Sequence, residues 1–238
     1  MLNLTDYQNK ISRDGFTILA DIYTADEIDA ILNTISQADQ SNPTFRKTED
    51  LFAIRQFLKE VPDVKPLVLN KKLTACVAGL FGDSYFIVKS IYFDKPPQSN
   101  WFVAWHQDLT ISVDKKIDLP GYGPWTTKLN QFAVQPPVDI LRDNFTLRIH
   151  LDDTDEGNGA LKVIPGSHVN ITRVETLNLQ AGESATCNVP AGGIMIMRPL
   201  LMHASGRSTN NKQRRVVHIE FSKTELTEGI DWAEKQEI

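Results

Sequence analysis

Residues 85–93 read Tyr-Phe-Ile-Val-Lys-Ser-Ile-Tyr-Phe, and this stretch decides the fold class of the chain. Phe86, Val88, Ser90 and Tyr92 alternate with a second set of side chains, and a period of two is typical of a β-strand. Turn residues separate further strand candidates at 101–113, 145–152, 160–164, 193–197 and 214–222. Short strands at this spacing favour a jelly roll or a related sandwich.

The preceding residues, 1–83, are expected to be mainly helical and to cover one side of the β structure. Thr-x-x-Gln/Glu capping boxes occur at 5–8 and 24–27, and apolar residues recur at helical spacing after the second. A short strand is expected at 15–19 and a second helical region at about 64–80.

The β core is expected to span 84–222, and the segment 114–144 interrupts its pattern. This segment is rich in Pro and Gly, and a loop of that length in a compact domain is typically a lid or a binding segment. The chain has no internal repeat and no linker long enough to separate two cores. We therefore expect a single domain over 1–238.

Composition narrows the functional classes. The chain has 41% hydrophobic residues, and 25 Lys and Arg against 30 Asp and Glu give a net charge of −5, so neither disorder nor nucleic-acid binding is expected. Cys76 and Cys187 form no CxxC pair, which favours a reducing cytoplasm. No uncharged apolar run approaches the ~18 residues of a membrane span, and no signal peptide is recognisable. The sequence leaves the oligomeric state open.

The chemistry of the chain begins at Trp105-His106-Gln107-Asp108. On a strand, residues i and i+2 share a face, so His106 and Asp108 can offer an imidazole and a carboxylate to one ion. His203, at the end of an apolar run, supplies a third ligand. Two His and one carboxylate with open positions form the facial triad of non-haem Fe(II) oxygenases. Arg214 follows His203 by eleven residues, and its guanidinium can bind a carboxylate through two hydrogen bonds.

With these residues in view, the chain resembles the phytanoyl-CoA dioxygenase family of Fe(II)- and 2-oxoglutarate-dependent oxygenases. The resemblance covers nearly the whole chain. Further matching pieces are Asp14-Gly15-Phe16, Phe93-Asp94-Lys95, Asn158-Gly159-Ala160-Leu161 and Pro165-Gly166-Ser167-His168. The resemblance implies a mostly β fold with flanking helices, built on a double-stranded β-helix (jelly-roll, cupin-like) core.

The resemblance also implies the roles of the site residues. His106, Asp108 and His203 become the iron ligands, and Arg214, assisted by Ser205, becomes the partner of the distal carboxylate of 2-oxoglutarate. Fe(II), 2-oxoglutarate and O₂ are then the cofactor and cosubstrates, with succinate and CO₂ released, and no acid or base beyond the metal centre is expected. Because Asp108 is retained where some members have Gly or Ala, hydroxylation is expected rather than halogenation.

Strand parity separates Arg214 from its neighbour Arg215. Arg214, Val216, His218 and Glu220 share the more polar face, which would point into a wet cavity, whereas Arg215 lies on the apolar face.

Four further positions are candidates for contacts with the substrate or the cosubstrate. Arg148 and His150 share the polar face of the strand at 145–152, which either lines the cavity or forms an exposed edge. Trp125 either closes over a substrate or fixes the loop as a hydrophobic plug, and Arg55 is a weaker candidate from the helical part.

Two residues before the His-Gln-Asp strand are assigned to the cosubstrate. Alignment to the family places Ile91 against 2-oxoglutarate. Lys89 either adds positive potential there or is a surface charge.

The sequence therefore leaves three candidate functions. The first is hydroxylation of a small-molecule substrate, with a carboxylated metabolite such as an amino acid derivative favoured by the candidate inward cations. The second uses the same site for desaturation, cyclisation or epimerisation, as in natural-product biosynthesis. The third is a non-catalytic cupin-like binding module, which a missing ligand or a missing arginine would favour.

Overall fold

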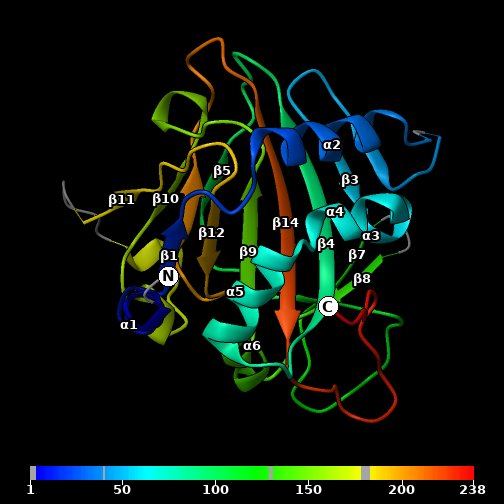
Figure 1. Cartoon of the computed structure of the whole chain (residues 1–238). Helices are drawn as coiled ribbons and strands as arrows, with labels where there is room; N and C mark the ends of the chain where they lie inside the picture. The colour runs from blue at the N-terminus through cyan, green and yellow to red at the C-terminus, as the bar shows by residue number, and fades with distance from the viewer. Residues whose placement is uncertain (1–3, 40, 129–130, 178–182) are drawn as a thin grey trace.

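A computed structural model of the chain describes residues 4–39, 41–128, 131–177 and 183–238 (Figure 1). The α-helices are α1 (Leu4–Asp14), α2 (Ala25–Ser36), α3 (Phe57–Glu60), α4 (Lys65–Val68), α5 (Lys71–Phe81) and α6 (Val138–Asp143). Short 3-10 helices lie at Pro62–Val64, Glu156–Asn158, Ser167–Val169 and Val174–Thr176. The strands are β1 (Phe16–Leu19), β2 (Phe45–Lys47), β3 (Phe52–Arg55), β4 (Phe86–Lys95), β5 (Val103–His106), β6 (Ile111–Val113), β7 (Trp125–Lys128), β8 (Gln131–Val134), β9 (Phe145–His150), β10 (Leu161–Val163), β11 (Ala185–Thr186), β12 (Ile194–Met197), β13 (His203–Ser205) and β14 (Arg214–Ser222).

These strands form antiparallel sheets. A seven-stranded sheet has the order β1-β12-β9-β14-β4-β3-β2, and a four-stranded sheet has the order β11-β10-β13-β5. A third sheet, β6-β8-β7, extends beyond them. The sequence-based expectation of a mostly β fold with flanking helices and a jelly-roll core is confirmed.

The two faces of the large sheet have different partners. Leu147, Ile149, Val217, Ile219 and Phe221 belong to the main hydrophobic cluster, together with apolar residues of α2 and α5. In Figure 1 these helices lie over the large sheet. The opposite face carries the polar residues of β9 and β14 that parity assigned to a cavity.

The helices differ from the expected ones at their ends. The capping box at 24–27 is formed: the Thr24 hydroxyl accepts from the Glu27 backbone N–H and the Glu27 carboxylate accepts from the Thr24 N–H. The box at 5–8 is not an N-terminal cap, because α1 already begins at Leu4. The helical region expected at about 64–80 consists of two helices, α4 and α5, because the Asn70 side-chain oxygen caps the start of α5.

Two expected β segments need correction. The strand expected at 101–113 is divided into β5 and β6, so Asp108 lies between strands rather than on one. The segment 114–144 is not an open loop, because it contains β7, β8 and α6 and packs against a second hydrophobic cluster. Residues 1–83 likewise contribute β2 and β3 to the large sheet, which the helical expectation for this part did not include.

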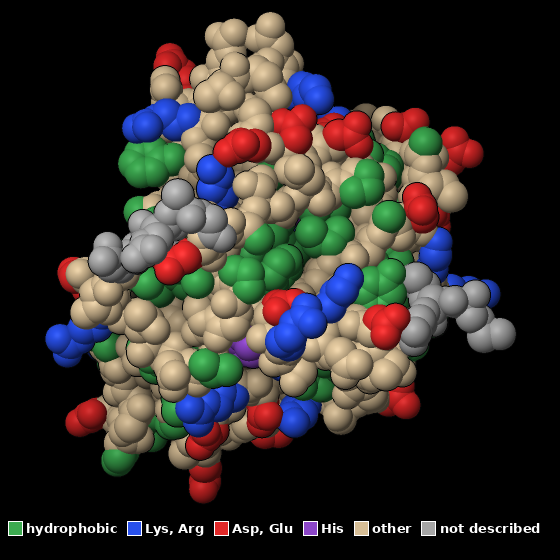
Figure 2. All heavy atoms as spheres, turned by 90° about the vertical axis from the view of Figure 1, so that its left-hand side faces the viewer, with side chains coloured by type: hydrophobic (Ala, Val, Ile, Leu, Met, Phe, Trp, Pro, Cys, Tyr) green, Lys and Arg blue, Asp and Glu red, His purple; other side chains and the backbone are tan. Residues whose placement is uncertain are grey.

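The side that carries β10 and β11 is shown in Figure 2, where hydrophobic side chains gather across the middle of the face. Val169, Ile171 and Val174, in the connection between β10 and β11, are exposed. Within the described residues, every helix is too short or too polar to cross a membrane.

Candidate metal centre and adjoining pocket

Two neighbouring strands bring the candidate histidine ligands together. His106 ends β5, His203 begins β13, and the two residues are direct partners in the antiparallel ladder. Their ring centroids are 4.2 Å apart. Strand pairing therefore places two imidazoles side by side although 97 residues separate them in the sequence.

Asp108 joins them from the turn that follows β5. Its backbone N–H donates to the Pro199 carbonyl over 2.9 Å, which ties the turn to the chain before β13. One carboxylate oxygen lies 3.6 Å from His106 Nε2 and the other lies 3.8 Å from His203 Nε2. A ligand atom from each of the three residues lies within 4.8 Å of the other two.

The imidazoles are oriented for metal binding. His106 Nδ1 donates to the Ala104 carbonyl and His203 Nδ1 donates to the Leu201 carbonyl, each over 2.8 Å. Both Nε2 atoms face the Asp108 carboxylate, and a hydrogen bond from Nδ1 to a backbone carbonyl is the arrangement that orients a metal-binding histidine. The donor set of two imidazoles and one carboxylate fits a divalent iron.

Gln107, between two of the ligands, was not singled out in the sequence. Its side-chain amide donates to the carbonyls of Leu200 and Asn170, and its carbonyl accepts from the Thr172 N–H. These bonds fix the His106–Asp108 segment against the chain before β13. From the sequence, the signal for this structural role was a polar residue placed between two ligand residues. The structure shows that Gln107 is buried and that its polar atoms are hydrogen-bonded.

Electrostatics favour the charged form of Asp108. Burial alone raises the pKa of this carboxyl, but His203, His106 and Lys89 together hold its pKa well below the usual range. Burial lowers the pKa of His203, which favours the neutral imidazole needed by a metal.

A cavity of about 160 Å³ adjoins the three ligands, between the large sheet and the four-stranded sheet. It is lined by Lys89, Ile91, Phe93, Trp101, Val103, His106, Asp108, Arg148, Leu161, His203, Ser205, Arg214, His218 and Glu220.

Arg214 and Ser205 meet at one side of this cavity. Arg214 Nη1 donates to the Gly159 carbonyl over 2.7 Å, and Ser205 Oγ donates to the same oxygen over 2.9 Å. Arg214 Nε is buried and has no hydrogen-bond partner among the described residues. Because an unpaired buried guanidinium is costly, this geometry fits the distal carboxylate of 2-oxoglutarate.

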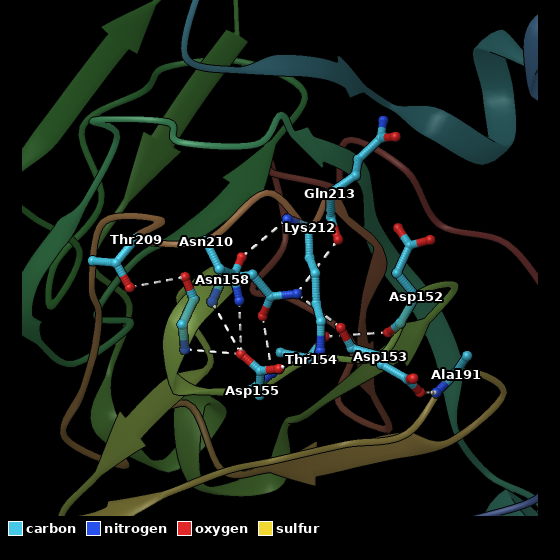
Figure 3. A network of polar contacts seen from close by, with 11 residues as sticks. Asp152, Asp153, Thr154, Asp155, Asn158, Ala191, Thr209, Asn210, Lys212 and Gln213 are labelled. Carbon is cyan, nitrogen blue, oxygen red and sulfur yellow. Dashed lines mark hydrogen bonds and ion pairs between the residues drawn. The ribbon is translucent and has the colours of Figure 1, made fainter.

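The turn that carries Gly159 is held by a polar network (Figure 3). Asp155 accepts from the backbone N–H groups of Gly157 and Asn158 and pairs with Lys212 at 3.0 Å. The Asn158 side chain donates to the carbonyls of Asp153 and Gln213. This network fixes the turn to the segment that leads into Arg214.

A second set of charged side chains lines the same cavity. Arg148 Nη1 donates to His218 Nδ1 over 3.1 Å, and His218 Nε2 donates to Glu220 over 3.1 Å. Glu220 also pairs with Lys89 at 2.8 Å. From the sequence, His218 and Glu220 were placed only on the polar face of their strand, and their parity with Arg214 was the available signal.

The predicted residues therefore separate into two groups. Lys89, Ile91, Arg148, Ser205 and Arg214 line the cavity beside the metal ligands.

The other group lies away from the lining of the cavity. His150 is buried and its Nδ1 forms a hydrogen bond with the Thr154 hydroxyl. Trp125 packs against the second hydrophobic cluster. Arg55, on β3, lies opposite Ile91 of β4 in the strand register. Arg215 pairs with Asp152 at 2.6 Å on the other face of β14.

The family of the chain agrees with this geometry. The phytanoyl-CoA dioxygenase (PhyH) family model matches residues 11–216. This chain belongs to the phytanoyl-CoA dioxygenase family. Membership and the donor set together make it an iron- and 2-oxoglutarate-dependent oxygenase, and the sequence-based recognition is confirmed.

Three proteins similar to this chain are one curated relative and two solved structures. A probable alpha-ketoglutarate-dependent hypophosphite dioxygenase of Stutzerimonas stutzeri is 23% identical over 91% of this chain and 78% of its own length. HygX from Streptomyces hygroscopicus, solved with nickel and 2-oxoglutarate, is 14% identical over 96% of this chain and 89% of its own, with a TM-score of 0.67. The carbocyclase SnoK from nogalamycin biosynthesis is 15% identical over 91% and 83%, also with a TM-score of 0.67.

Proposed function

We propose that this oxygenase hydroxylates a small-molecule substrate at a C–H bond, consuming O₂ and 2-oxoglutarate and releasing succinate and CO₂. One oxygen atom of O₂ enters the hydroxyl group and the other enters succinate. The observation that carries the proposal is the cluster of His106, Asp108 and His203 beside the buried, unpaired Nε of Arg214. Iron and 2-oxoglutarate supply the oxidant when both are bound.

In this proposal, the chain binds and orients the reactants. Arg214 and Ser205 hold the distal carboxylate of 2-oxoglutarate, and Ile91 contacts its carbon chain. Lys89 lines the same cavity, where its ammonium group pairs with the Glu220 carboxylate. Phe93, Trp101 and Leu161 provide apolar walls that limit water at the metal. A small carboxylated metabolite, such as an amino acid derivative, is the favoured substrate class because the lining contains a further cation, Arg148.

The test is an anaerobic titration of the metal-free protein with Fe(II) and then with 2-oxoglutarate. A weak visible charge-transfer band of the chelated keto acid is expected in the wild type and is expected to be lost in His203→Ala. A folded, metal-loaded wild type without this band would contradict the proposal and favour a non-catalytic binding module. Succinate release on adding candidate substrates then identifies the substrate.

A second candidate is oxidation without oxygen insertion, such as desaturation, cyclisation or epimerisation, at the same site. The similarity in fold to a carbocyclase is the observation that favours it. Product mass separates the candidates, because hydroxylation adds one oxygen atom, desaturation or ring closure removes two hydrogen atoms, and epimerisation leaves the mass unchanged.

A further inference from the structure

We propose that Arg148 binds a singly charged oxyanion of the substrate, and that the substrate carries no ammonium group to offset this charge. The proposal rests on the function above, because it takes iron and 2-oxoglutarate to occupy the side of the cavity at Arg214. It narrows the substrate class from carboxylated metabolites in general to compact monoanions.

Arg148 has the geometry of an anion site. It projects from the middle of β9 into the cavity that the metal ligands line, and 8% of its surface is accessible. Its Nη1 bonds the neutral His218, and its Nε is buried with no partner among the described residues. No carboxylate in the described part of the chain forms an ion pair with it. A buried guanidinium without an anion is costly, so the cavity is complete only with a negative group against Arg148.

The neighbours of Arg148 fix its position without neutralising it. A guanidinium can only donate, so His218 Nδ1 accepts from it and His218 Nε2 carries the proton that goes to Glu220. Glu220 is itself paired with Lys89 at 2.8 Å. The register of the large sheet supports this chain of contacts, since His218 lies opposite Arg148 on β9 and Glu220 lies opposite Lys89 on β4.

The charges of the lining predict the charge of the substrate. Its cations are Lys89, Arg148 and Arg214, and its carboxylates are Asp108 and Glu220. A divalent iron and the dianion of 2-oxoglutarate cancel each other, which leaves one positive charge. Lys95, which interacts with Arg214, and Glu234, which interacts with Lys89 and Glu220, are buried outside the lining and cancel each other when both are ionised. A substrate with one negative charge neutralises the filled cavity.

The same balance disfavours a free amino acid. Its ammonium group needs an unpaired carboxylate, but Asp108 is directed to the metal and Glu220 is already paired with Lys89. A carboxylate whose amine is acylated, or a phosphorus oxyanion with a single charge, meets Arg148 without this cost. The same cavity of about 160 Å³ also has to hold 2-oxoglutarate, so the space left for the substrate favours a compact molecule.

The first experiment measures binding without turnover. Nickel-loaded protein saturated with 2-oxoglutarate is titrated calorimetrically with four probes: N-acetylalanine, dimethylphosphinate, alanine and N-acetylalaninamide. The first two are monoanions, the third is a zwitterion and the fourth is neutral. At least one monoanion is expected to bind about tenfold or more tighter than alanine and the neutral amide, because hydrogen bonds to charged groups contribute roughly 1.5–3 kcal/mol. The stronger monoanion distinguishes a carboxylate from a phosphorus source.

Variants then assign this preference to Arg148. Arg148→Gln is expected to remove the preference for the monoanion, and Arg148→Lys is expected to keep part of it. Arg215→Gln is the matched control, because Arg215 lies on the opposite face of the same sheet and pairs with Asp152. The affinity for 2-oxoglutarate, measured by the charge-transfer band with Fe(II), is expected to change by no more than about twofold in Arg148→Gln, as for independent sites.

His218 is a positioning residue in this proposal, and its role has its own test. His218→Ala is expected to weaken monoanion binding while leaving binding of the neutral amide unchanged. His218→Gln offers an amide carbonyl that can accept from Arg148, and it is expected to restore part of the monoanion affinity. Equal effects of both substitutions on the charged and neutral probes would contradict the positioning role.

Several results would overturn the proposal. One is a large loss of 2-oxoglutarate affinity in Arg148→Gln, which would make Arg148 part of the cosubstrate site. Others are equal binding of monoanion and neutral amide, tighter binding of alanine, or no binding of either monoanion by the wild type. Failure of the proposed function is distinguishable from these results, because the wild type would then lack the 2-oxoglutarate band itself.

Discussion

Gly159 lies where two cavity residues contact the backbone. Its carbonyl accepts hydrogen bonds from both Arg214 and Ser205. Its φ of +82° belongs to the left-handed region, and a Cβ there would lie 2.6 Å from the Gly206 carbonyl oxygen and 2.6 Å from Lys95 Nζ. The glycine thus allows the close approach that orients the arginine.

Gly159→Ala is therefore expected to lower the free energy of unfolding by roughly 1–3 kcal/mol and to weaken 2-oxoglutarate binding. Denaturant unfolding and the anaerobic charge-transfer titration measure the two effects. Gly82→Ala is the matched control, since Gly82 has a φ of +86° but no neighbour within 4 Å of the added Cβ. Equal 2-oxoglutarate affinities for the two variants would show that the contacts of Gly159 are unimportant for the site.

Arg214→Gln is expected to weaken 2-oxoglutarate binding by at least about thirtyfold, because truncating one partner of a buried charge pair costs roughly 2–5 kcal/mol. Iron binding should persist, since the three ligands are unchanged. Arg215→Gln removes the next arginine of the same strand and should leave the titration within about twofold of the wild type. The opposite ranking would reverse the assignment of the two arginines.

At the residue scale, the sequence predicted those positions whose faces follow from strand parity. Arg214 lines the cavity and Arg215 does not, as alternation along 214–222 indicated. Gly159 as a shared acceptor and the bonds of Gln107 could not be predicted, because they depend on where separate turns meet in space. His150 shares parity with Arg148 but lies beyond the cavity, because a face extends further than the pocket that it lines.

At the scale of elements, α5 is attached to the large sheet by stacked aromatic rings. The Phe81 and Phe145 ring centroids are 3.9 Å apart, and those of Phe145 and Phe221 are 4.7 Å apart, with nearly parallel planes in both pairs. Phe145 and Phe221 are fully buried. The stack thus joins a helix to two central strands of the sheet.

Phe145→Ala is expected to lower the free energy of unfolding by roughly 3–5 kcal/mol, because a large cavity would remain between α5 and the sheet. Denaturant unfolding measures this change. Val169→Ala, at an exposed residue, should change stability by no more than about 0.5 kcal/mol. A small effect at Phe145 would show that α5 shifts to fill the space.

The sequence predicted elements best where one local pattern extends over the whole element. The alternation in 85–93 and the capping box at 24–27 agree with β4 and α2. The division of 64–80 comes from a local cap, because the Asn70 side chain accepts from the Leu73 N–H and starts a new helix within continuous apolar spacing. In 114–144, Pro and Gly obscured β7 and β8, which pair with each other, while β8 also pairs with β6.

At the scale of the whole molecule, the C-terminal segment returns to the centre of the large sheet. The Glu234 carboxyl accepts hydrogen bonds from the Ser90 backbone N–H at 3.0 Å and from Ser90 Oγ at 2.7 Å. Burial raises the pKa of Glu234 from 4.5 to about 7, and Glu220 adds to the increase, whereas the Ser90 bonds and Lys89 oppose it. Between these two values, the folded protein binds more protons than the unfolded chain.

The stability that Glu234 contributes is therefore fully present below about pH 4.5 and is lost as the pH rises to about 7. In Glu234→Gln this contribution is absent. The stability of the wild type relative to the variant should fall by roughly 1–3 kcal/mol between about pH 5 and pH 7.5. Thermal unfolding of both metal-loaded proteins over this range measures the difference, and parallel pH profiles would contradict the shifted pKa.

The architecture as a whole was predictable, whereas the connections between distant segments were not. Alternation and turn spacing indicated a jelly roll, and the structure has its two facing sheets. The return of the C-terminal segment to Ser90 and the addition of β2 and β3 to the sheet have no local pattern. Both depend on backbone groups of β4 that meet their partners only in the folded chain.

The position of β5 affects which part of the fold opens first in local unfolding. β5 is the edge strand of its sheet, and a register irregularity interrupts its pairing with β13. A metal held by His106 and His203 cross-links these two strands and adds its binding free energy to that edge. Removing the metal with a chelator should therefore increase amide hydrogen exchange in β5 before it affects β9 or β14. A metal bound there would thus also stabilise the pairing of β5 with β13.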